Sequence, residues 1–215
     1  MTELSPGLEK LLEKSNVPKK PGDPGTVEPK CQYFGKCGGC HLQHLPYQEQ
    51  LDFKTQTVRS LFEGVGIDPS LVHDASGSDV PWNYRNKIDL TAKTFEDELH
   101  LGFLPYGEKH SLIEFESCPI ADPSINEALT GIRKALPRHR VLQKKLISLV
   151  CRASKKQEKI GIVYHSKLKE PNVYSDLTMD IMGETDKVIG GVYVQKRREH
   201  ITGVKSLEET ILGKE

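Results

Sequence analysis

The chain has 215 residues, 36% of them hydrophobic and 28% charged, which suits one large globular domain or two small ones. Its 30 basic and 30 acidic residues cancel, which excludes a uniformly basic coat for nucleic acid but leaves room for a local basic face. No stretch is long and apolar enough to span a membrane, and the N-terminus lacks the apolar run of a signal peptide. We therefore expect a cytoplasmic protein whose cysteines are reduced or bound to metal.

The first thirty residues are expected to be a leader and linker, residues 1–30. Leucines at helical spacing predict a short helix near the start: Leu8, Leu11 and Leu12. Prolines exclude regular structure in the stretch that follows: Pro18, Pro21, Pro24 and Pro29.

The strongest feature is a cysteine-rich segment that comes next. CQYFGKCGGC places Cys31, Cys37 and Cys40 at C-x5-C-x2-C spacing, and Cys118 follows at a distance, directly before a proline. Interspersed glycines let the backbone turn tightly around a ligand, and a Cys-Pro step often supplies the last ligand of an iron–sulfur cluster. A four-iron cluster is the favoured interpretation. Structural zinc is an alternative, although it usually pairs two C-x2-C knuckles, and a site without metal is a third. The fifth cysteine, Cys151, alternates with polar neighbours as on a strand, so we expect it in the core.

The remaining elements follow from periodicity. Apolar residues at helical spacing predict a helix over 45–67 that ends at Gly64 or Gly66. Residues 84–95 and 98–107 predict a hairpin, and 111–120 a short strand that delivers Cys118. Asp122 as N-cap predicts a helix over 121–139. Strands are expected at 146–154, 159–166 and 186–197.

Short turns between most of these strands predict an α+β fold with a mainly antiparallel sheet, flanking helices and an N-terminal cysteine-rich loop. The expected organisation is the leader, then the cysteine loop with its helix at 31–66, and then a central α+β region at 67–215 that binds RNA and closes the metal site through Cys118.

Charge is concentrated in one window. Between residues 131 and 159 there are ten basic residues and one acidic residue, which indicates either a solvated surface or a patch that contacts phosphate. Arg85 and Lys87 form a second cluster beside Trp82 and Tyr84, two aromatic residues that could stack on RNA bases or simply pack in the core. The candidate RNA contacts are Arg85, Lys87, Arg133, Lys134, Arg138, Arg140, Lys144 and Lys145.

These motifs together resemble the RNA (uracil-5-)-methyltransferase family, in the branch that carries an iron–sulfur cluster. CQYFGKCGGCHLQHLPYQEQLDFK, YRNKIDL, GFLPYG and ESCPI carry the resemblance, strongly over residues 31–120 and more weakly beyond. It implies that the four cysteines outside the core bind a four-iron cluster. It also places Gln43, His44 and Tyr47 on the family's Q-H-x-x-Y stretch, and Tyr84, Arg85 and Lys87 on its Y-R-x-K strand motif.

Members of that family methylate carbon 5 of a uridine in ribosomal or transfer RNA with S-adenosylmethionine. The chain has no glycine-rich cofactor loop, no Pro-Pro and no Asn-Pro, so no catalytic or cofactor-binding residue is assigned. We therefore expect the Rossmann-like methyltransferase domain to be absent, and S-adenosylmethionine to act only if a separate domain or chain supplies the catalytic part. RNA is the expected partner; DNA and membrane are not.

Two other functions remain open from the sequence. A stand-alone iron–sulfur electron carrier would be reduced reversibly and would not bind RNA. A zinc-dependent RNA-binding protein would be colourless and would have no enzymatic role.

Overall fold

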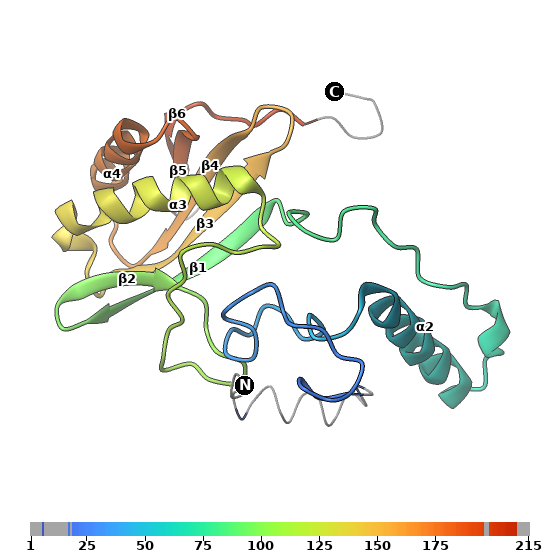
Figure 1. The fold of residues 1–215 in the computed structure, drawn as a ribbon. Helices are drawn as coiled ribbons and strands as arrows, with labels where there is room; N and C mark the ends of the chain where they lie inside the picture. Colours follow the sequence, from blue (N-terminus) through green and yellow to red (C-terminus); the bar gives the residue numbers. More distant parts are fainter. Residues whose placement is uncertain (1–5, 7–16, 18, 196–197, 210–215) are drawn as a thin grey trace. The chain divides into compact units, whose positions relative to one another are not determined.

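The computed structural model describes all residues except 1–5, 7–16, 18, 196–197 and 210–215 (Figure 1). The helix predicted from the N-terminal leucines therefore lies outside the described residues. The chain forms two compact units. The first contains Met1–Pro81 and Pro105–Ser111, and the second contains Trp82–Leu104 and Leu112–Glu215.

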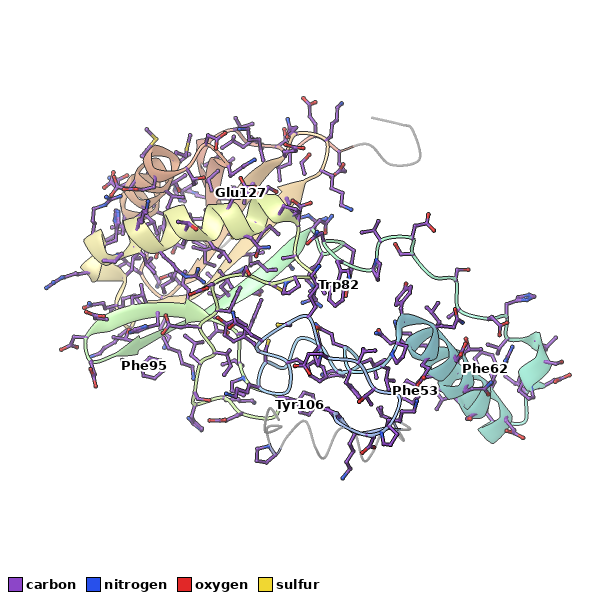
Figure 2. All side chains as sticks on the ribbon, in the orientation of Figure 1. Phe53, Phe62, Trp82, Phe95, Tyr106 and Glu127 are labelled. Carbon is purple, nitrogen blue, oxygen red and sulfur yellow. The ribbon has the colours of Figure 1, made fainter. Side chains whose placement is uncertain are left out.

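The first unit is built around one long helix, α2 (Tyr47–Gly64), followed by a short 3₁₀ helix, η1 (Pro69–Leu71). This confirms the helix predicted from the sequence, which ends at Gly64 as expected. Thr55 is its buried residue, and the Thr55 hydroxyl accepts the backbone N–H of Ala75 at 2.9 Å. Apolar side chains further along α2 stay accessible, and Phe62 is 39% exposed (Figure 2). The helix therefore packs mainly through its N-terminal half.

The second unit contains a six-stranded sheet in the order β2-β1-β3-β4-β5-β6. The predicted hairpin is confirmed, because β1 and β2 pair antiparallel around a turn in which Glu96 and Asp97 both have positive φ. The strands predicted at 146–154, 159–166 and 186–197 also form. The bounds are β1 Lys87–Phe95, β2 Glu98–Gly102, β3 Leu146–Ser154, β4 Lys159–Ser166, β5 Val188–Gln195 and β6 Arg198–Gly203.

The sheet is mixed, so the prediction of a mainly antiparallel α+β fold is wrong. β4 and β5 run parallel and are connected by α4 (Pro171–Glu184), a helix that the sequence analysis did not identify. Parallel neighbours need a long crossover connection, and α4 supplies it. Its buried residues are spaced three and four apart along the helix: Tyr174, Leu177, Thr178 and Ile181.

The other helix of this unit, α3 (Pro123–Ala135), begins where the sequence predicted. Asp122 is its N-cap, and the Asp122 carboxylate accepts the backbone N–H of Ser124 at 3.0 Å. Two 3₁₀ turns follow it, η2 (Leu136–Arg138) and η3 (Arg140–Leu142). α3 and α4 both cover one face of the sheet, and the core lies between them and the central strands (Figure 1).

Two further expectations need correction. Residues 111–120 do not form a strand, because only an isolated bridge joins Ile113 to Phe103. Ile147 was expected to share the buried face of Cys151 but is 49% exposed, since the register between β3 and β4 shifts at this point. Cys151 itself is fully buried, as predicted. Among the described helices, none is long and apolar enough to cross a bilayer.

Candidate functional site

The cysteine segment forms a loop of tight turns in the first unit. The backbone N–H of Phe34 donates to the Cys31 carbonyl at 2.9 Å, and that of Cys37 donates to the Tyr33 carbonyl at 2.9 Å. Gly35, with φ +87°, takes a left-handed conformation that other residues rarely adopt. A bridge from Cys37 to Pro105 joins the loop to the second segment of the same unit. The thiols of this loop are half-buried.

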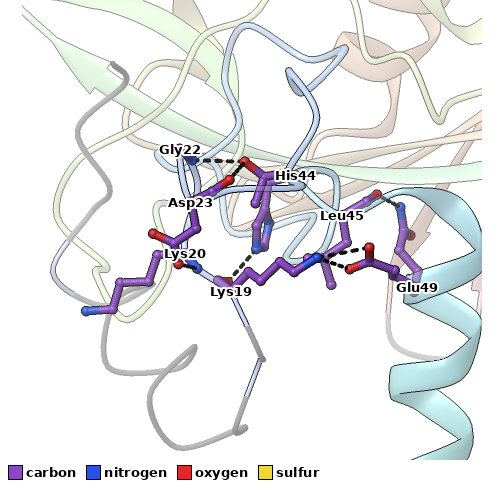
Figure 3. A network of polar contacts seen from close by, with 9 residues as sticks. Lys19, Lys20, Gly22, Asp23, His44, Leu45 and Glu49 are labelled. Carbon is purple, nitrogen blue, oxygen red and sulfur yellow. Dashed lines mark hydrogen bonds and ion pairs between the residues drawn. The ribbon is translucent and has the colours of Figure 1, made fainter.

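Histidine and glutamine side chains line the same loop. His44 is fully buried and is tilted against the Phe34 ring, with 5.6 Å between centroids. Its Nε2 lies 2.9 Å from the Lys19 carbonyl, so this nitrogen carries the proton and Nδ1 is the acceptor (Figure 3). Burial lowers the pKa of His44, which favours the neutral ring. Lys19 is in turn held at 2.8 Å by Glu49 in the first turn of α2.

Several polar atoms near the loop are buried without a hydrogen-bond partner among the described residues. They are His41 Nε2, Gln43 Nε2 and His44 Nδ1. Buried polar groups are normally satisfied, so a cluster of this kind is unusual and marks the loop as a place where another group could bind.

The arrangement does not form a complete metal centre. Within the described ranges, no group of three or more His, Cys, Asp and Glu side chains is placed to hold one metal ion. The three loop cysteines provide suitable thiol donors, but their geometry does not fit a cluster. Cys118, the predicted fourth ligand, belongs to the second unit, where Asn126 fixes its backbone through hydrogen bonds of 2.9 and 3.1 Å. The cluster ligands therefore stay a prediction of the sequence.

The predicted RNA contacts fall into two groups in the second unit. Arg133 turns inward: it donates to the carbonyls of Phe115 and Glu116, and its guanidinium lies 5.6 Å from the Phe115 ring centroid. Arg138 pairs with acidic residues of α4, with Glu184 at 2.9 Å and Asp180 at 3.3 Å. The hydrogen bond from Glu184 raises the pKa of Arg138. These two arginines are structural in this arrangement.

The other predicted contacts are more accessible. Lys134, Arg140, Lys144 and Lys145 are exposed around the end of α3 and the 3₁₀ turns. Lys144 is 3.5 Å from Asp97, but this pair is exposed and therefore weak. The backbone of Arg85 is fixed by Ile120 and Asp122.

Lys87 has a cross-strand partner that the sequence analysis missed. Arg152 on β3 lies opposite Lys87 in register, and both are exposed. Their strand neighbours Ile88 and Cys151 are buried beneath the helices, so the two cations project from the open face of the sheet. Arg152 lies inside the basic window, and its place on a strand was the signal that could have paired it with Lys87.

The connection between β4 and α4 is where a nucleotide-type cofactor would bind in a parallel βαβ unit. Here it contains no glycine, and the hydroxyls of Tyr174 and Tyr193 both donate to the Leu168 carbonyl, at 2.8 and 2.7 Å. Tyr174 also stacks on Tyr193, with 4.0 Å between ring centroids. These residues do not fit a glycine-rich cradle for S-adenosylmethionine, and we assign no residue to that cofactor.

Comparisons with known proteins give a consistent result. No family model matches the chain. It is 36% identical over 127 residues to an uncharacterized RNA methyltransferase from Caldanaerobacter subterraneus, which covers 59% of this chain and 26% of that protein. Similar proteins from Staphylococcus aureus, at 38% over 113 residues, and Clostridium tetani, at 35% over 116 residues, are also named RNA methyltransferases. The matches span 51% and 54% of this chain, and 24% and 25% of those proteins. The matched region is thus about a quarter of these relatives.

A solved structure shares the fold. The tRNA (uracil-54, C5)-methyltransferase from Pyrococcus abyssi, in complex with S-adenosyl-L-homocysteine, superposes with a TM-score of 0.55 at 21% identity. The match covers 85% of this chain and 41% of that one. The expectation that a methyltransferase fold is absent is therefore wrong: missing sequence motifs did not mean a missing fold, and the mixed sheet belongs to a fold that occurs in a tRNA methyltransferase.

Proposed function

We propose that this chain is an RNA-binding region of an RNA (uracil-5-)-methyltransferase, which positions transfer or ribosomal RNA for methylation at carbon 5 of a uridine. The observation that carries this proposal is the agreement between relatives named as RNA methyltransferases and a fold shared with a tRNA (uracil-54, C5)-methyltransferase. S-adenosylmethionine would supply the methyl group when bound, as the complex of the structural neighbour suggests.

The open face of the sheet supports RNA binding by this region. Lys87 and Arg152 lie side by side on β1 and β3, exposed and directly opposite in register. Paired cations on a flat surface can contact successive phosphates, and such contacts make binding depend on salt. Arg140 and Lys145 add exposed positive charge elsewhere in the same unit.

The test is RNA binding by fluorescence anisotropy with labelled tRNA and ribosomal RNA fragments across a range of salt. Replacing Lys87 and Arg152 by Ala should weaken binding about tenfold and reduce the salt slope by roughly one unit. The matched control removes two exposed lysines of the first unit, Lys20 and Lys54, and should change affinity much less. The proposal fails if the wild-type chain binds neither RNA, or if both double variants behave alike.

The cysteine loop supports a second, separate proposal: that Cys31, Cys37, Cys40 and Cys118 bind a four-iron cluster. Its support is the donor set and the buried, unsatisfied polar atoms beside the loop. Anaerobic purification with iron, sulfide and zinc analysis tests it. A Cys37→Ser variant should lose the iron, whereas Cys151→Ala, in the core, should keep it. One zinc without iron would favour the zinc interpretation, and a metal-free chain would reject both.

A further inference from the structure

The last described segment of the chain, residues 204–209, lies across the sheet in a track lined by glycine; we call it the strap. Gly161, Gly190 and Gly203 are neighbours in register on β4, β5 and β6. A Cβ placed on Gly190 would be only 2.5 Å from the Val204 carbonyl oxygen. The track exists because these positions carry no side chain, and it lets the strap backbone rest directly on the sheet.

The direction of the strap is set where it leaves β6. Gly203 has φ +77°, a left-handed conformation that turns the chain back over the strands. The backbone N–H of Val204 then donates to the Ile189 carbonyl at 2.9 Å, and Leu207 lies over Gly161. The path of the strap is therefore encoded in the backbone and does not depend on a single side chain.

The far end of the strap meets the turn between β3 and β4, residues 155–158. The Ser154 hydroxyl donates to the Glu208 carbonyl, and the Glu208 N–H donates to Gln157 Oε1 at 3.0 Å. The Lys155 N–H donates to the Glu209 carboxylate at 3.0 Å. Lys156 Nζ lies 3.6 Å from the Glu208 carboxylate. Two carboxylates of the strap are thus held at one turn.

That turn has the features of an anion site. It presents a backbone N–H and a lysine ammonium together, a combination by which proteins bind carboxylate and phosphate oxygens. Lys155 and Lys156 are flanked by Arg152 and Lys159, with Glu158 as the acidic residue among them. The carboxylates of Glu208 and Glu209 show that the turn accepts anionic oxygen.

We propose that the β3–β4 turn is a site for RNA phosphate, and that the strap masks it with its own carboxylates until RNA displaces them. This inference rests on the proposed RNA-binding function and adds a particular site to it. An attached segment competes at a high effective concentration, so RNA sees the site only in the fraction of molecules whose strap is released. Releasing the strap should therefore strengthen RNA binding.

The experiment compares three variants of the full chain in binding a fluorescently labelled RNA stem–loop. The double variant Glu208→Gln/Glu209→Gln removes both carboxylates and should lower the Kd about three- to tenfold. Gln157→Ala releases the strap without changing charge and should lower the Kd about twofold. The control Glu96→Gln/Glu98→Gln makes the same charge change at the β1–β2 turn and should stay within about twofold of the wild type.

Two further readouts separate a mask from a purely structural contact. The strap-released variants should show a steeper salt dependence, because the turn then contacts an additional phosphate. Hydrogen exchange of residues 204–209 should accelerate when RNA binds the wild-type chain. Circular dichroism checks that each variant folds.

The outcomes are distinguishable. Tighter binding by both release variants, with an unchanged control, supports the mask. RNA binding that is equal in all variants, or that leaves exchange of the strap unchanged, overturns the mask while RNA binding by the region stands. If no variant binds RNA, the proposed function fails and this inference fails with it.

Discussion

The buried hydroxyl pair between β4 and α4 gives the sharpest prediction for stability. Thr178 is fully buried and Tyr164 is 1% exposed. The Thr178 hydroxyl donates to the Tyr174 carbonyl at 2.7 Å, so Tyr164 donates in turn to Thr178 Oγ1 at 2.9 Å. Thr178→Val keeps the shape of the side chain but leaves the Tyr164 hydroxyl buried without a partner. The expected loss of unfolding free energy is about 1–3 kcal/mol.

The reverse change should cost less. Tyr164→Phe removes the donor and leaves the Thr178 hydroxyl bonded to the Tyr174 carbonyl, so we expect about 0.5–1.5 kcal/mol. The double variant strands no hydroxyl, and its cost should therefore fall below the sum of the single costs by about 1 kcal/mol. This non-additivity is the specific signature of the pair.

Urea unfolding followed by Trp82 fluorescence measures these energies, because Trp82 is the single tryptophan and belongs to the second unit. The matched control is Thr57→Val on α2, where an exposed threonine makes the same bond, to the Phe53 carbonyl at 2.8 Å. It should change stability by less than about 0.5 kcal/mol. Equal stability of Thr178→Val and the wild type, or additive single effects, would refute the reasoning.

Three more predictions follow from the second unit. Asp122→Ala removes the N-cap of α3 and should cost about 1–2 kcal/mol in the same urea assay, whereas Asp122→Asn should cost less. Burial raises the pKa of the Cys151 thiol to about 12, so iodoacetamide at neutral pH should label Cys151 only after unfolding, as read by mass spectrometry. The hydrogen bond from His139 is the main cause that lowers the pKa of Asp180, so its stabilisation is present above the unfolded pKa and is lost as pH falls through the folded one. The difference in urea midpoint between the wild type and Asp180→Asn should therefore shrink below the usual titration range of aspartate.

The elements predicted correctly are those with local signals. Asp122 followed by a proline marked the start of α3, and the polar turn at Glu96 and Asp97 marked the β1–β2 hairpin. The missed elements depend on distant partners. The turn-like stretch before α4 concealed a crossover helix, and the parallel pairing of β4 with β5 is fixed only when that helix packs on the sheet. Periodicity alone does not show this.

The candidate site divides in the same way. The spacing of the cysteines is visible in the sequence, but the arrangement of their thiols is not. The fates of Arg133 and Arg138 were equally hidden, because their partners lie far along the chain, at the Phe115 carbonyl and at Glu184. A window of basic charge cannot show which of its members are neutralised by tertiary contacts. It therefore predicted the region of positive charge but not which residues remain accessible.

The division of the chain has a consequence for how the protein can be made and cut. The chain completes most of the first unit, enters the second at Trp82, and supplies residues 105–111 to the first before returning. Those residues include Pro105, which bridges to Cys37, and Tyr106, whose ring meets His41 edge-on at 5.5 Å. During synthesis the cysteine loop must therefore wait for this excursion to leave the ribosome. A gene fragment that stops at Pro81 would encode an incomplete unit, whatever its boundary suggests.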